Sequence, residues 1–477
     1  MSPAPPAGWT VELDPGTRVI EGGRVLVGGQ PFRLLRLTEA GARLVDRLRQ
    51  GAPVPDAQAA RSLIGRLVDG SMVQPVPPSG GGPSLDDVAV VIPVRGPASG
   101  VERTLESLGP LLGRGEVVVV DDGSPEPSAI RVAVEARGGS VVRHERSLGP
   151  AAARNTGWRV TNRPLVLFVD ADIEAELGWL DPLLALLADP AIAAVAPRVR
   201  SSAGDAPSWL AAYDAVRSSL DLGPHRALVR HRTRVSYVPT ATLLVRRTAL
   251  EEVDGFDEAL RVGEDVDLVW RLVAAGAPVR YEPRAVVRHP ARASVAAWLQ
   301  QRFRYGTAAA DLAARHGDAV APLHVSGWSA ATWGLVLIGR PYTALAVGTG
   351  TTIGLAPKLD ALERPALEAA RIAGLGHLHA ARSVATAVRR TWWPLALLLA
   401  WRAPRSRRPL AAVAVLPGLL SWWEARPALD PARHAMLHLA DDVAYGAGVW
   451  AGCGRRRSIR ALLPAWAGRI PRPDVLD

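Results

Sequence analysis

The chain has 477 residues, of which 48% are hydrophobic, and it carries a formal net charge of +10. This length allows two or three domains with a large core. Cys453 is the only cysteine, which excludes a disulfide framework and a thiolate zinc site and fits a reducing compartment. The basic charge suits phosphates, nucleic acid or anionic lipid without choosing among them. The first residues lack the basic start and apolar stretch of a signal peptide.

Residues 1–75 have the pattern of a small α+β module. Trp9–Leu13 and Arg24–Val27 are predicted strands joined through a glycine turn. Two helices are predicted at Glu39–Arg49 and Asp56–Asp69, where apolar residues recur at helical spacing. Strands followed by two short helices in this length predict a winged-helix-like module.

Residues 76–84 are rich in proline and glycine and form a predicted linker, after which strand and helix signals alternate through residues 85–315. The predicted strands are Val88–Val94, Glu116–Val120, Val141–His144, Leu165–Val169 and Ile192–Val195. The predicted helices are Val101–Leu108, Ala129–Ala136, Ala151–Arg159 and Gly178–Leu187. This alternation predicts an α/β domain with a parallel sheet covered by helices on both faces.

Residues 316–477 are rich in Trp, Ala and Leu, but their apolar segments are short. These segments are Val325–Gly339, Tyr342–Ala356, Trp392–Trp401 and Leu410–Trp423. A spanning helix needs about 20 apolar residues, and none of them reaches that length without enclosing Arg or Pro. Trp at the segment ends with Arg beside it is typical of membrane interfaces. We expect helices that lie in or dip into a membrane face; spanning helices and soluble core helices are the alternatives.

Asp170 and Asp172 directly follow the apolar run Leu165–Val169, which has the pattern of a strand buried on both faces. Ligands of parallel sheets bind just beyond the carboxyl ends of the strands. Two carboxylates at this spacing can face one Mg²⁺ or Mn²⁺ ion that is shared with a substrate phosphate. His289, just past the apolar run Ala285–Val287, is a candidate third ligand. The alternative is a solvated turn that caps the next helix.

The second predicted strand ends in Asp121, Asp122, Gly123 and Ser124. Paired carboxylates at a strand end, followed by a glycine turn, can accept hydrogen bonds from a nucleobase N–H or from ribose hydroxyls. The alternative is an ordinary surface turn. The motif is therefore a candidate nucleoside site only in the company of other motifs at the same edge of the sheet.

Two further segments are candidates for contact with a nucleotide. The first strand ends near Pro93 and Arg95 in a Gly/Pro/Ser loop that can approach a nucleotide closely. Gly149 precedes a predicted helix whose first turns carry Arg154 and Asn155. A cation and free backbone donors at a helix N-terminus suit a pyrophosphate. The alternative for Arg154 is a side chain that faces solvent.

An acidic run begins at Glu264 and Asp265, directly after a glycine. Acidic residues at the start of a helix are favoured by the positive end of the helix dipole, which alone could explain the run. A carboxylate there could also act as a general base that removes a proton from an attacking hydroxyl. Further on, Trp298, Arg302 and Arg304 supply stacking surface and cations. They could close over a nucleotide or a glycan, or form a packed basic helix.

The order of these motifs resembles the family 2 glycosyltransferases. Asp-Asp-Gly-Ser follows the second strand, Gly-Pro-x₃-Arg-Asn precedes the third helix, Asp-x-Asp follows the fourth strand, and Gly-Glu-Asp-x-Asp-Leu-x-x-Arg comes last. The resemblance covers about residues 85–315. It implies a GT-A fold that binds a nucleotide-diphospho-sugar together with Mn²⁺ or Mg²⁺.

The resemblance also implies a role for each acidic motif. Asp121 and Asp122 match the acidic pair at the uridine, whereas Asp170 and Asp172 match the motif at the metal and diphosphate. Asp265 matches the base of an inverting transfer, with the preceding glutamate beside it. A single displacement would convert an α-linked donor into a β-glycoside.

Nearly the full chain resembles the mycofactocin-system glycosyltransferases of actinobacteria. The resemblance rests on the N-terminal module, the hydrophobic C-terminal region, and the runs Arg234–Arg247 and Gly255–Arg271. This implies repeated β-1,4 transfer of glucose from UDP-glucose to premycofactocin, at the cytoplasmic face of the cell membrane. The module is similar to the peptide-recognition domains of ribosomal peptide pathways. It could bind a precursor peptide or pathway protein by strand addition, or serve as a tethered structural domain.

Three other functions compete with this interpretation. A DNA-binding membrane regulator would need a helix rich in base-contacting side chains, but Asp56–Asp69 offers only Gln58, Arg61 and Arg66, so we expect no nucleic-acid partner. A nucleotidyltransferase would use the same carboxylates but release pyrophosphate. A glycosyltransferase acting on a glycolipid or a cell-wall polysaccharide would use the same donor site with another acceptor.

Overall fold

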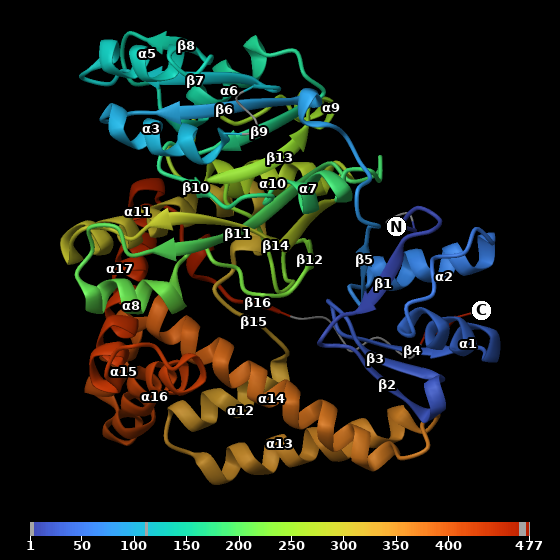
Figure 1. The fold of residues 1–477 in the computed structure, drawn as a ribbon. Helices are drawn as coiled ribbons and strands as arrows, with labels where there is room; N and C mark the ends of the chain where they lie inside the picture. The colour runs from blue at the N-terminus through green and yellow to red at the C-terminus, as the bar shows by residue number, and fades with distance from the viewer. Residues whose placement is uncertain (1–3, 110–112, 467–473, 477) are drawn as a thin grey trace. The chain divides into compact units, whose positions relative to one another are not determined.

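The computed structural model divides into two compact units (Figure 1). It describes residues 4–109, 113–466 and 474–476. The first unit consists of Met1–Ser202, Arg217–Ala291 and Pro473–Asp477, and the second of Ala203–Val216 and Arg292–Arg472. The predicted N-terminal module and most of the predicted α/β domain thus share one unit.

The N-terminal module is a small α+β structure around its own core. Strand β1 (Thr10–Leu13) pairs antiparallel with β5 (Val73–Val76), and a second sheet has the order β17 (Asp474–Leu476), β4 (Arg33–Leu37), β3 (Val25–Gly28), β2 (Arg18–Ile20). Helices α1 (Glu39–Arg49) and α2 (Gln58–Asp69) pack their apolar faces into the same core. The bounds of α1 were predicted correctly, because the Thr38 hydroxyl accepts the N–H of Gly41 at 3.2 Å and starts the helix there.

The α/β part of the first unit has a nine-stranded sheet with the order β10-β14-β11-β13-β9-β6-β7-β8, and β12 pairs with β14. Its strands are β6 (Val88–Val94), β7 (Glu116–Asp122), β8 (Ser140–His144), β9 (Leu165–Val169), β10 (Glu174–Ala175), β11 (Ala194–Ser202), β12 (Ala227–Val229), β13 (Thr242–Arg246) and β14 (Val279–Pro290).

The predicted strands, which correspond to β6, β7, β8, β9 and β11, all run in the same direction, as does β14 beside β11, but three strands that were not predicted run against them. Strands β8, β7, β6 and β9 run parallel. Strand β13 runs antiparallel to both β9 and β11, and β10 and β12 run antiparallel to β14. The sheet is therefore mixed, and the carboxyl end of β9 lies beside the amino end of β13, where Val169 pairs with Thr242.

Helices cover both faces of the parallel half, as the alternating pattern predicted. They include α3 (Ala98–Ser107), α5 (Pro127–Glu135) and α6 (Pro150–Val160). Alternate valines of β7 divide between the faces, with Val119 in the core beneath α3 and α5 and Val120 packed beside α6. Helix α6 lies very close to the sheet, since a Cβ on Gly157 would stand 2.2 Å from a methyl group of Val91.

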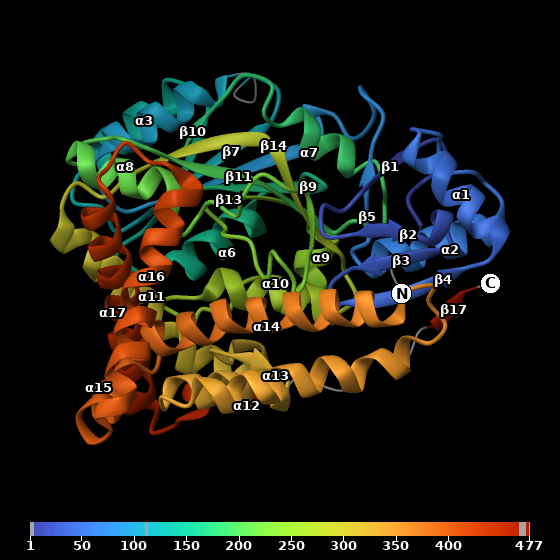
Figure 2. The same ribbon diagram turned by 90° about the horizontal axis from the view of Figure 1, so that it is seen from below.

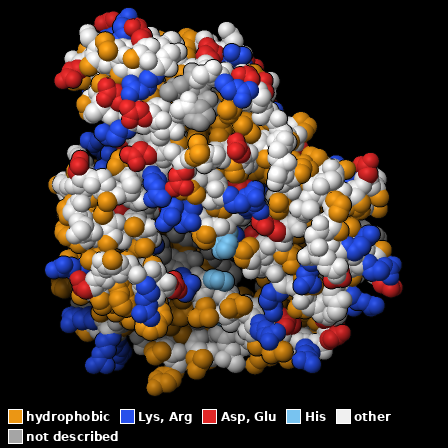
Figure 3. Space-filling view, viewed as in Figure 1, with side chains coloured by type: hydrophobic (Ala, Val, Ile, Leu, Met, Phe, Trp, Pro, Cys, Tyr) orange, Lys and Arg blue, Asp and Glu red, His pale blue; other side chains and the backbone are white. Residues whose placement is uncertain are grey.

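The second unit is mainly helical (Figure 2). Its main helices are α11 (Val295–His316), α12 (Gly327–Leu337), α13 (Pro341–Leu355), α14 (Pro365–Arg390), α15 (Trp393–Arg402), α16 (Arg407–Ala425) and α17 (Pro431–Arg456). In Figure 3, hydrophobic side chains reach the surface along the lower edge, over α12 and α13. Among the residues described, every helix is too short or too polar to cross a membrane.

Candidate active site

Asp170 and Asp172 stand directly after β9, as predicted, and the structure gives them different neighbours. The backbone N–H of Asp170 donates to the carbonyl of Ala241, just before β13, at 2.9 Å. Oδ2 of Asp172 lies 3.3 Å from Nε2 of His289, near the end of β14. The structure thus brings together Asp172 and His289, two of the three predicted metal ligands.

The third predicted ligand, Asp170, is engaged by an arginine. Oδ1 of Asp170 accepts from Nη2 of Arg154 at 2.7 Å, and 30% of the Asp170 side chain is exposed. Within the described ranges, no group of three or more His, Cys, Asp or Glu side chains is arranged to hold a metal ion. The accessible carboxylates still fit Mn²⁺ or Mg²⁺, because such ions are commonly bound through one or two carboxylates and the substrate phosphates.

Arg154 connects the end of β9 to the catalytic candidates downstream. It projects from α6, is buried, and donates through Nη1 to Oε1 of Glu264 at 2.9 Å as well as to Asp170. Burial alone would lower the pKa of Arg154, but the charges of Asp170 and Glu264 raise it above its ordinary value. The buried guanidinium therefore stays charged and holds two carboxylates of the site in place.

Helix α10 (Glu264–Ala274) begins directly after Gly263, whose positive φ of 84° suits glycine. Asp265 lies in the first turn of this helix. Burial, followed by the charge of Glu264, raises the pKa of Asp265 to about 7, although the Val266 N–H and Arg154 oppose this rise. A carboxyl group with such a pKa is a suitable general base near neutral pH.

Asp122 is the centre of a hydrogen-bond network at the end of β7. Its carboxylate accepts from Nδ1 of His144 at 2.8 Å, Oγ of Ser147 at 2.7 Å, and the backbone N–H groups of Leu148 at 2.8 Å and Gly149 at 2.9 Å. Burial would raise the pKa of Asp122, but these hydrogen bonds lower it. The four bonds use the acceptor capacity of a carboxylate, so Asp122 organises the loop before α6. Its contact with uridine stays a prediction.

Asp121 and the glycine turn hold the neighbouring loops. Oδ1 of Asp121 accepts from the N–H of Ser124 at 2.8 Å, and its other oxygen pairs with Arg143. The Ser124 hydroxyl accepts from the N–H of Gly96, beyond β6, at 3.2 Å. Gly123 has a φ of 75°, and a Cβ there would approach the backbone of the adjacent loop to 2.8 Å. The structure therefore brings all four residues of this motif together at the sheet edge.

Sequence reasoning missed Arg143 and His144. Both lie on β8, where Arg143 pairs in register with Asp121 and His144 with Asp122. Polar residues opposite each other on neighbouring parallel strands could indicate such pairs, but only if the register of the strands is known in advance. Nε2 of His144 also lies 2.9 Å from Oγ1 of Thr156, which ties β8 to α6.

The remaining candidates of the α/β domain differ in their surroundings. Pro93 lies within β6, and Arg95 is exposed just beyond its end. The amide of Asn155 is buried and donates to the carbonyl of Phe256 at 2.8 Å and to Glu258 at 2.9 Å, while its oxygen accepts the N–H of Phe256 at 2.9 Å. Asn155 therefore fastens the segment before α10, and a direct contact with a nucleotide-sugar stays a prediction.

Arg302 and Arg304 belong to α11 in the second unit. Arg302 is buried, and its guanidinium binds Asp214 at 3.2 Å and Asp441 at 3.0 Å. Arg304 is exposed. The contacts of Arg302 correspond to the alternative of a packed basic helix, because two carboxylates of its own unit already engage the guanidinium.

The mixed sheet, the helices on both its faces, and the carboxylates at the ends of β7 and β9 define an α/β glycosyltransferase of the GT-A type. The model of the family described as glycosyl transferase family 2 matches residues 89–253. The chain is 42% identical over 475 residues to the pre-mycofactocin glycosyltransferase of Mycobacterium tuberculosis (strain H37Rv), and the match covers 96% of this chain and 98% of that protein. The chain belongs to the family 2 glycosyltransferases.

Two further proteins are similar over smaller parts or at lower identity. The succinoglycan biosynthesis protein ExoU of Rhizobium meliloti (strain 1021) is 31% identical over 206 residues, which cover 40% of this chain and 58% of ExoU. The solved structure of the mannosyltransferase PcManGT from Pyrobaculum calidifontis with GDP-Man and Mn²⁺ covers 78% of this chain and 90% of its own, with 19% identity and a TM-score of 0.43. The family model and the full-length relative confirm the family predicted from the motif order, and the chain is a glycosyltransferase.

Replacing Asp122 by alanine is expected to lower the free energy of unfolding by about 3 kcal/mol, because the substitution leaves four donors without their charged acceptor. Denaturant unfolding followed by tryptophan fluorescence measures this loss. Asp86→Ala is the control, since it breaks only exposed contacts with Arg114 and with the Ser84 hydroxyl, and we expect it to leave stability unchanged. An Asp122→Ala variant as stable as the wild type would show that the network contributes little.

Proposed function

We propose that the chain transfers glucose from UDP-glucose to premycofactocin with inversion, and that repeated transfer builds a β-1,4-linked glucan. The observation that carries the catalytic part is the connection through Arg154, which binds both Asp170 of the metal motif and Glu264 beside Asp265. The acceptor is inferred from the M. tuberculosis relative, which is described as a pre-mycofactocin glycosyltransferase and aligns over 96% of this chain.

In the proposed reaction, Asp265 removes the proton from an acceptor hydroxyl. The hydroxyl oxygen then forms a bond to the anomeric carbon while the bond from that carbon to the diphosphate breaks, so one displacement inverts the configuration. Asp172 and His289, with Asp170, would hold Mn²⁺ or Mg²⁺, which when bound stabilises the charge of the departing diphosphate. Arg154 keeps Asp170 and Glu264 oriented throughout.

We expect kcat/KM for transfer to rise about tenfold per pH unit below pH 7 and to level off above it, because Asp265 acts only as the carboxylate and its pKa is raised to about 7. The contribution of Asp265 to the free energy of unfolding has the opposite pH dependence. A raised pKa means that the proton favours the folded state, so this stabilising contribution is present at low pH and is lost as the pH rises through about 7. Initial rates across this range test the assignment, and a flat profile would contradict it.

The acceptor is tested in cells. Mass spectrometry of small-molecule glycosides from cells with and without this chain should show hexosylated premycofactocin only where the chain is present. Accumulation of a glycolipid or of cell-wall glycans instead would favour the alternative acceptors. Release of pyrophosphate rather than nucleoside diphosphate by the purified protein would identify a nucleotidyltransferase.

For the N-terminal module, we propose that an extended precursor peptide, or a segment of a pathway protein, adds to its sheet. Support comes from β17, whose backbone pairs in parallel with β4 so that Asp474 stands opposite Leu35 and Leu476 opposite Leu37. An edge that accepts one extended segment can accept another. Fluorescence anisotropy with a labelled precursor peptide tests this, and we expect tighter binding to a chain that ends at Trp466. Equal or absent binding to both chains would refute it.

We further propose that the second unit binds the cytoplasmic face of the cell membrane. Four large aromatic residues of this unit are mostly exposed, namely Trp328 (67%), Tyr342 (87%), Trp401 (68%) and Trp423 (63%). Arg402 places its guanidinium 4.9 Å from the ring centre of Trp401, a combination typical of membrane interfaces. We expect flotation with anionic phosphatidylglycerol vesicles and its loss in Trp401→Ser/Trp423→Ser. A wild-type protein that stays unbound would refute the proposal.

A further inference from the structure

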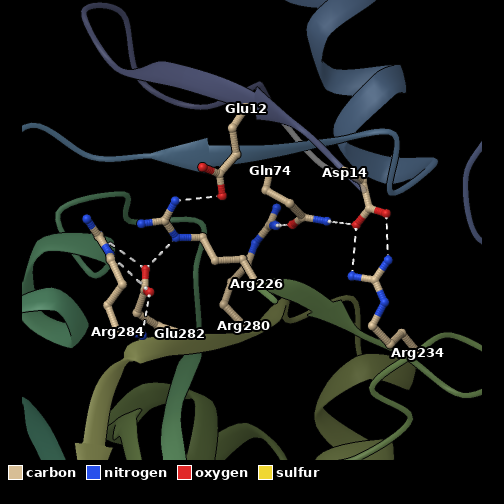
Figure 4. A network of polar contacts seen from close by, with 8 residues as sticks. All are labelled: Glu12, Asp14, Gln74, Arg226, Arg234, Arg280, Glu282 and Arg284. Carbon is tan, nitrogen blue, oxygen red and sulfur yellow. Dashed lines mark hydrogen bonds and ion pairs between the residues drawn. The ribbon is translucent and has the colours of Figure 1, made fainter. Parts of the chain in front are cut away.

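The N-terminal module is joined to the α/β sheet by a polar network whose centre is buried (Figure 4). Asp14, just after β1, accepts from Nη2 of Arg234 at 2.7 Å and from Nη1 at 3.3 Å. Gln74 of β5 donates to Asp14 at 3.2 Å and accepts from Arg280 of β14 at 3.1 Å. Asp14, Gln74 and Arg280 are each at most 5% exposed. The Asp14 side chain is 3% exposed and that of Arg234 is 27% exposed, so the loss of one partner from this partly shielded ion pair should cost more than the loss of a surface pair.

The network is organised by one short stretch of the α/β part. Arg226 donates to Glu12 of β1 at 2.7 Å, and Arg230 lies 3.5 Å from Asp69 at the end of α2. Together with Arg234, these arginines recur at every fourth position, and each binds a carboxylate of the module. Segment 226–241, which contains β12, therefore has its first half attached to the module.

The second half of segment 226–241 holds the two parts of the candidate active site. The carbonyl of Ser236 accepts from Nε1 of Trp270, on α10, at 2.7 Å. The carbonyl of Ala241 accepts from the N–H of Asp170 at 2.9 Å. Val238 and Thr240, which lie between these carbonyls, are buried, so this half of the segment is packed in place.

We infer that the N-terminal module positions the catalytic residues through segment 226–241, with Arg234 and Asp14 as positioning residues. Arg234 stands two residues before the carbonyl that anchors α10, and the first turn of α10 carries Asp265. Release of Arg234 from Asp14 would loosen the first half of segment 226–241, and a displacement passed along the chain to the packed second half would change the distance between Asp265 and the metal motif. A displacement of about 1 Å in an active site can reduce the rate by about 100-fold. The module thus affects the chemistry in addition to the proposed binding of a peptide.

The expected effect of the Asp14–Arg234 pair on the rate of sugar transfer rests on the proposed function. A double-mutant cycle of Asp14→Asn and Arg234→Gln measures this effect. We expect each single variant to lower kcat by about 10- to 100-fold while KM for the donor changes little. The double variant should be no slower than the slower single variant, because both break the same pair. Arg234→Lys, which keeps the charge, should restore part of kcat. Arg114→Gln, which breaks an exposed pair with Asp86, is the matched control and should match the wild type.

Hydrogen exchange of backbone amides gives a second measurement that requires no turnover. We expect faster exchange in α10 of Arg234→Gln than in α10 of the wild type or of Arg114→Gln. If Arg234→Gln is not recovered folded, Arg234→Lys replaces it, and both kcat and the exchange in α10 are measured on that variant. Unchanged kcat together with unchanged exchange in α10 overturns the inference. A wild-type protein that does not transfer sugar refutes the proposed function instead, and the exchange measurement still decides the role of Arg234.

Discussion

Asp265→Asn is expected to lower kcat of sugar transfer by about 1,000-fold or more, because an asparagine amide has nearly the shape of the carboxylate but does not accept a proton. Asp265 stands in the first turn of α10, and burial together with the charge of Glu264 raises its pKa to about 7. Affinity for the nucleotide-sugar donor should stay within a few-fold of the wild type, since the removed function concerns the acceptor.

Initial transfer rates and calorimetric titration with UDP-glucose separate these two effects. Asp254→Asn is the matched control, because Asp254 is 94% exposed, pairs only at the surface with Arg159, and should leave both quantities unchanged. Transfer by Asp265→Asn at the wild-type rate would show that another group takes the proton. Loss of donor binding would show instead that Asp265 contributes to the donor site.

Arg154→Met is expected to destabilise the protein by about 3 to 5 kcal/mol near neutral pH, because it removes the cation from between Asp170 and Glu264. Methionine fills much of the same space, so the change is mainly one of charge. Arg154 also lowers the pKa of Asp265, and its loss should therefore raise that pKa further above 7. The destabilisation should be smaller near pH 5, where the carboxyl groups hold more protons.

Urea unfolding at about pH 5 and about pH 8 measures this dependence. Arg154→Met/Asp170→Asn is the comparison variant, since it also removes one of the opposing negative charges and should recover part of the stability. Equal losses at both pH values would indicate that Arg154 stabilises the fold by packing rather than by charge. A stable Arg154→Met protein would contradict the role given to the buried guanidinium.

The sequence predicted those elements whose signals are local. Strand β9 (Leu165–Val169) was predicted with its bounds because an unbroken apolar run ends in two aspartates, and α1 because Thr38 caps it. Strand β13 (Thr242–Arg246) was not predicted. Its antiparallel direction depends on pairing with β9 and β11, which no local pattern records.

For the candidate site, too, local sequence signals were predictive and contacts between distant residues were not predicted. Asp170, Asp172 and Asp265 were predicted from the order of the motifs, and the structure places the first two directly after β9 and Asp265 in the first turn of α10. Asp122 and Asn155 were expected to contact the nucleotide-sugar, whereas the structure shows their side chains engaged by protein groups. The pairing of Asp14 with Arg234 spans 220 residues, and a single sequence does not indicate which of its many arginines meets a given carboxylate.

The proposed transfer is tested by incubating the purified chain with UDP-glucose, premycofactocin and Mn²⁺, with the products identified by mass spectrometry and the anomeric configuration by NMR. We expect equal amounts of UDP and a β-glucoside, loss of both on chelation of the metal, and loss of both in Asp265→Asn. An α-glucoside, or full activity without a divalent cation, would show that the proposed reaction is wrong.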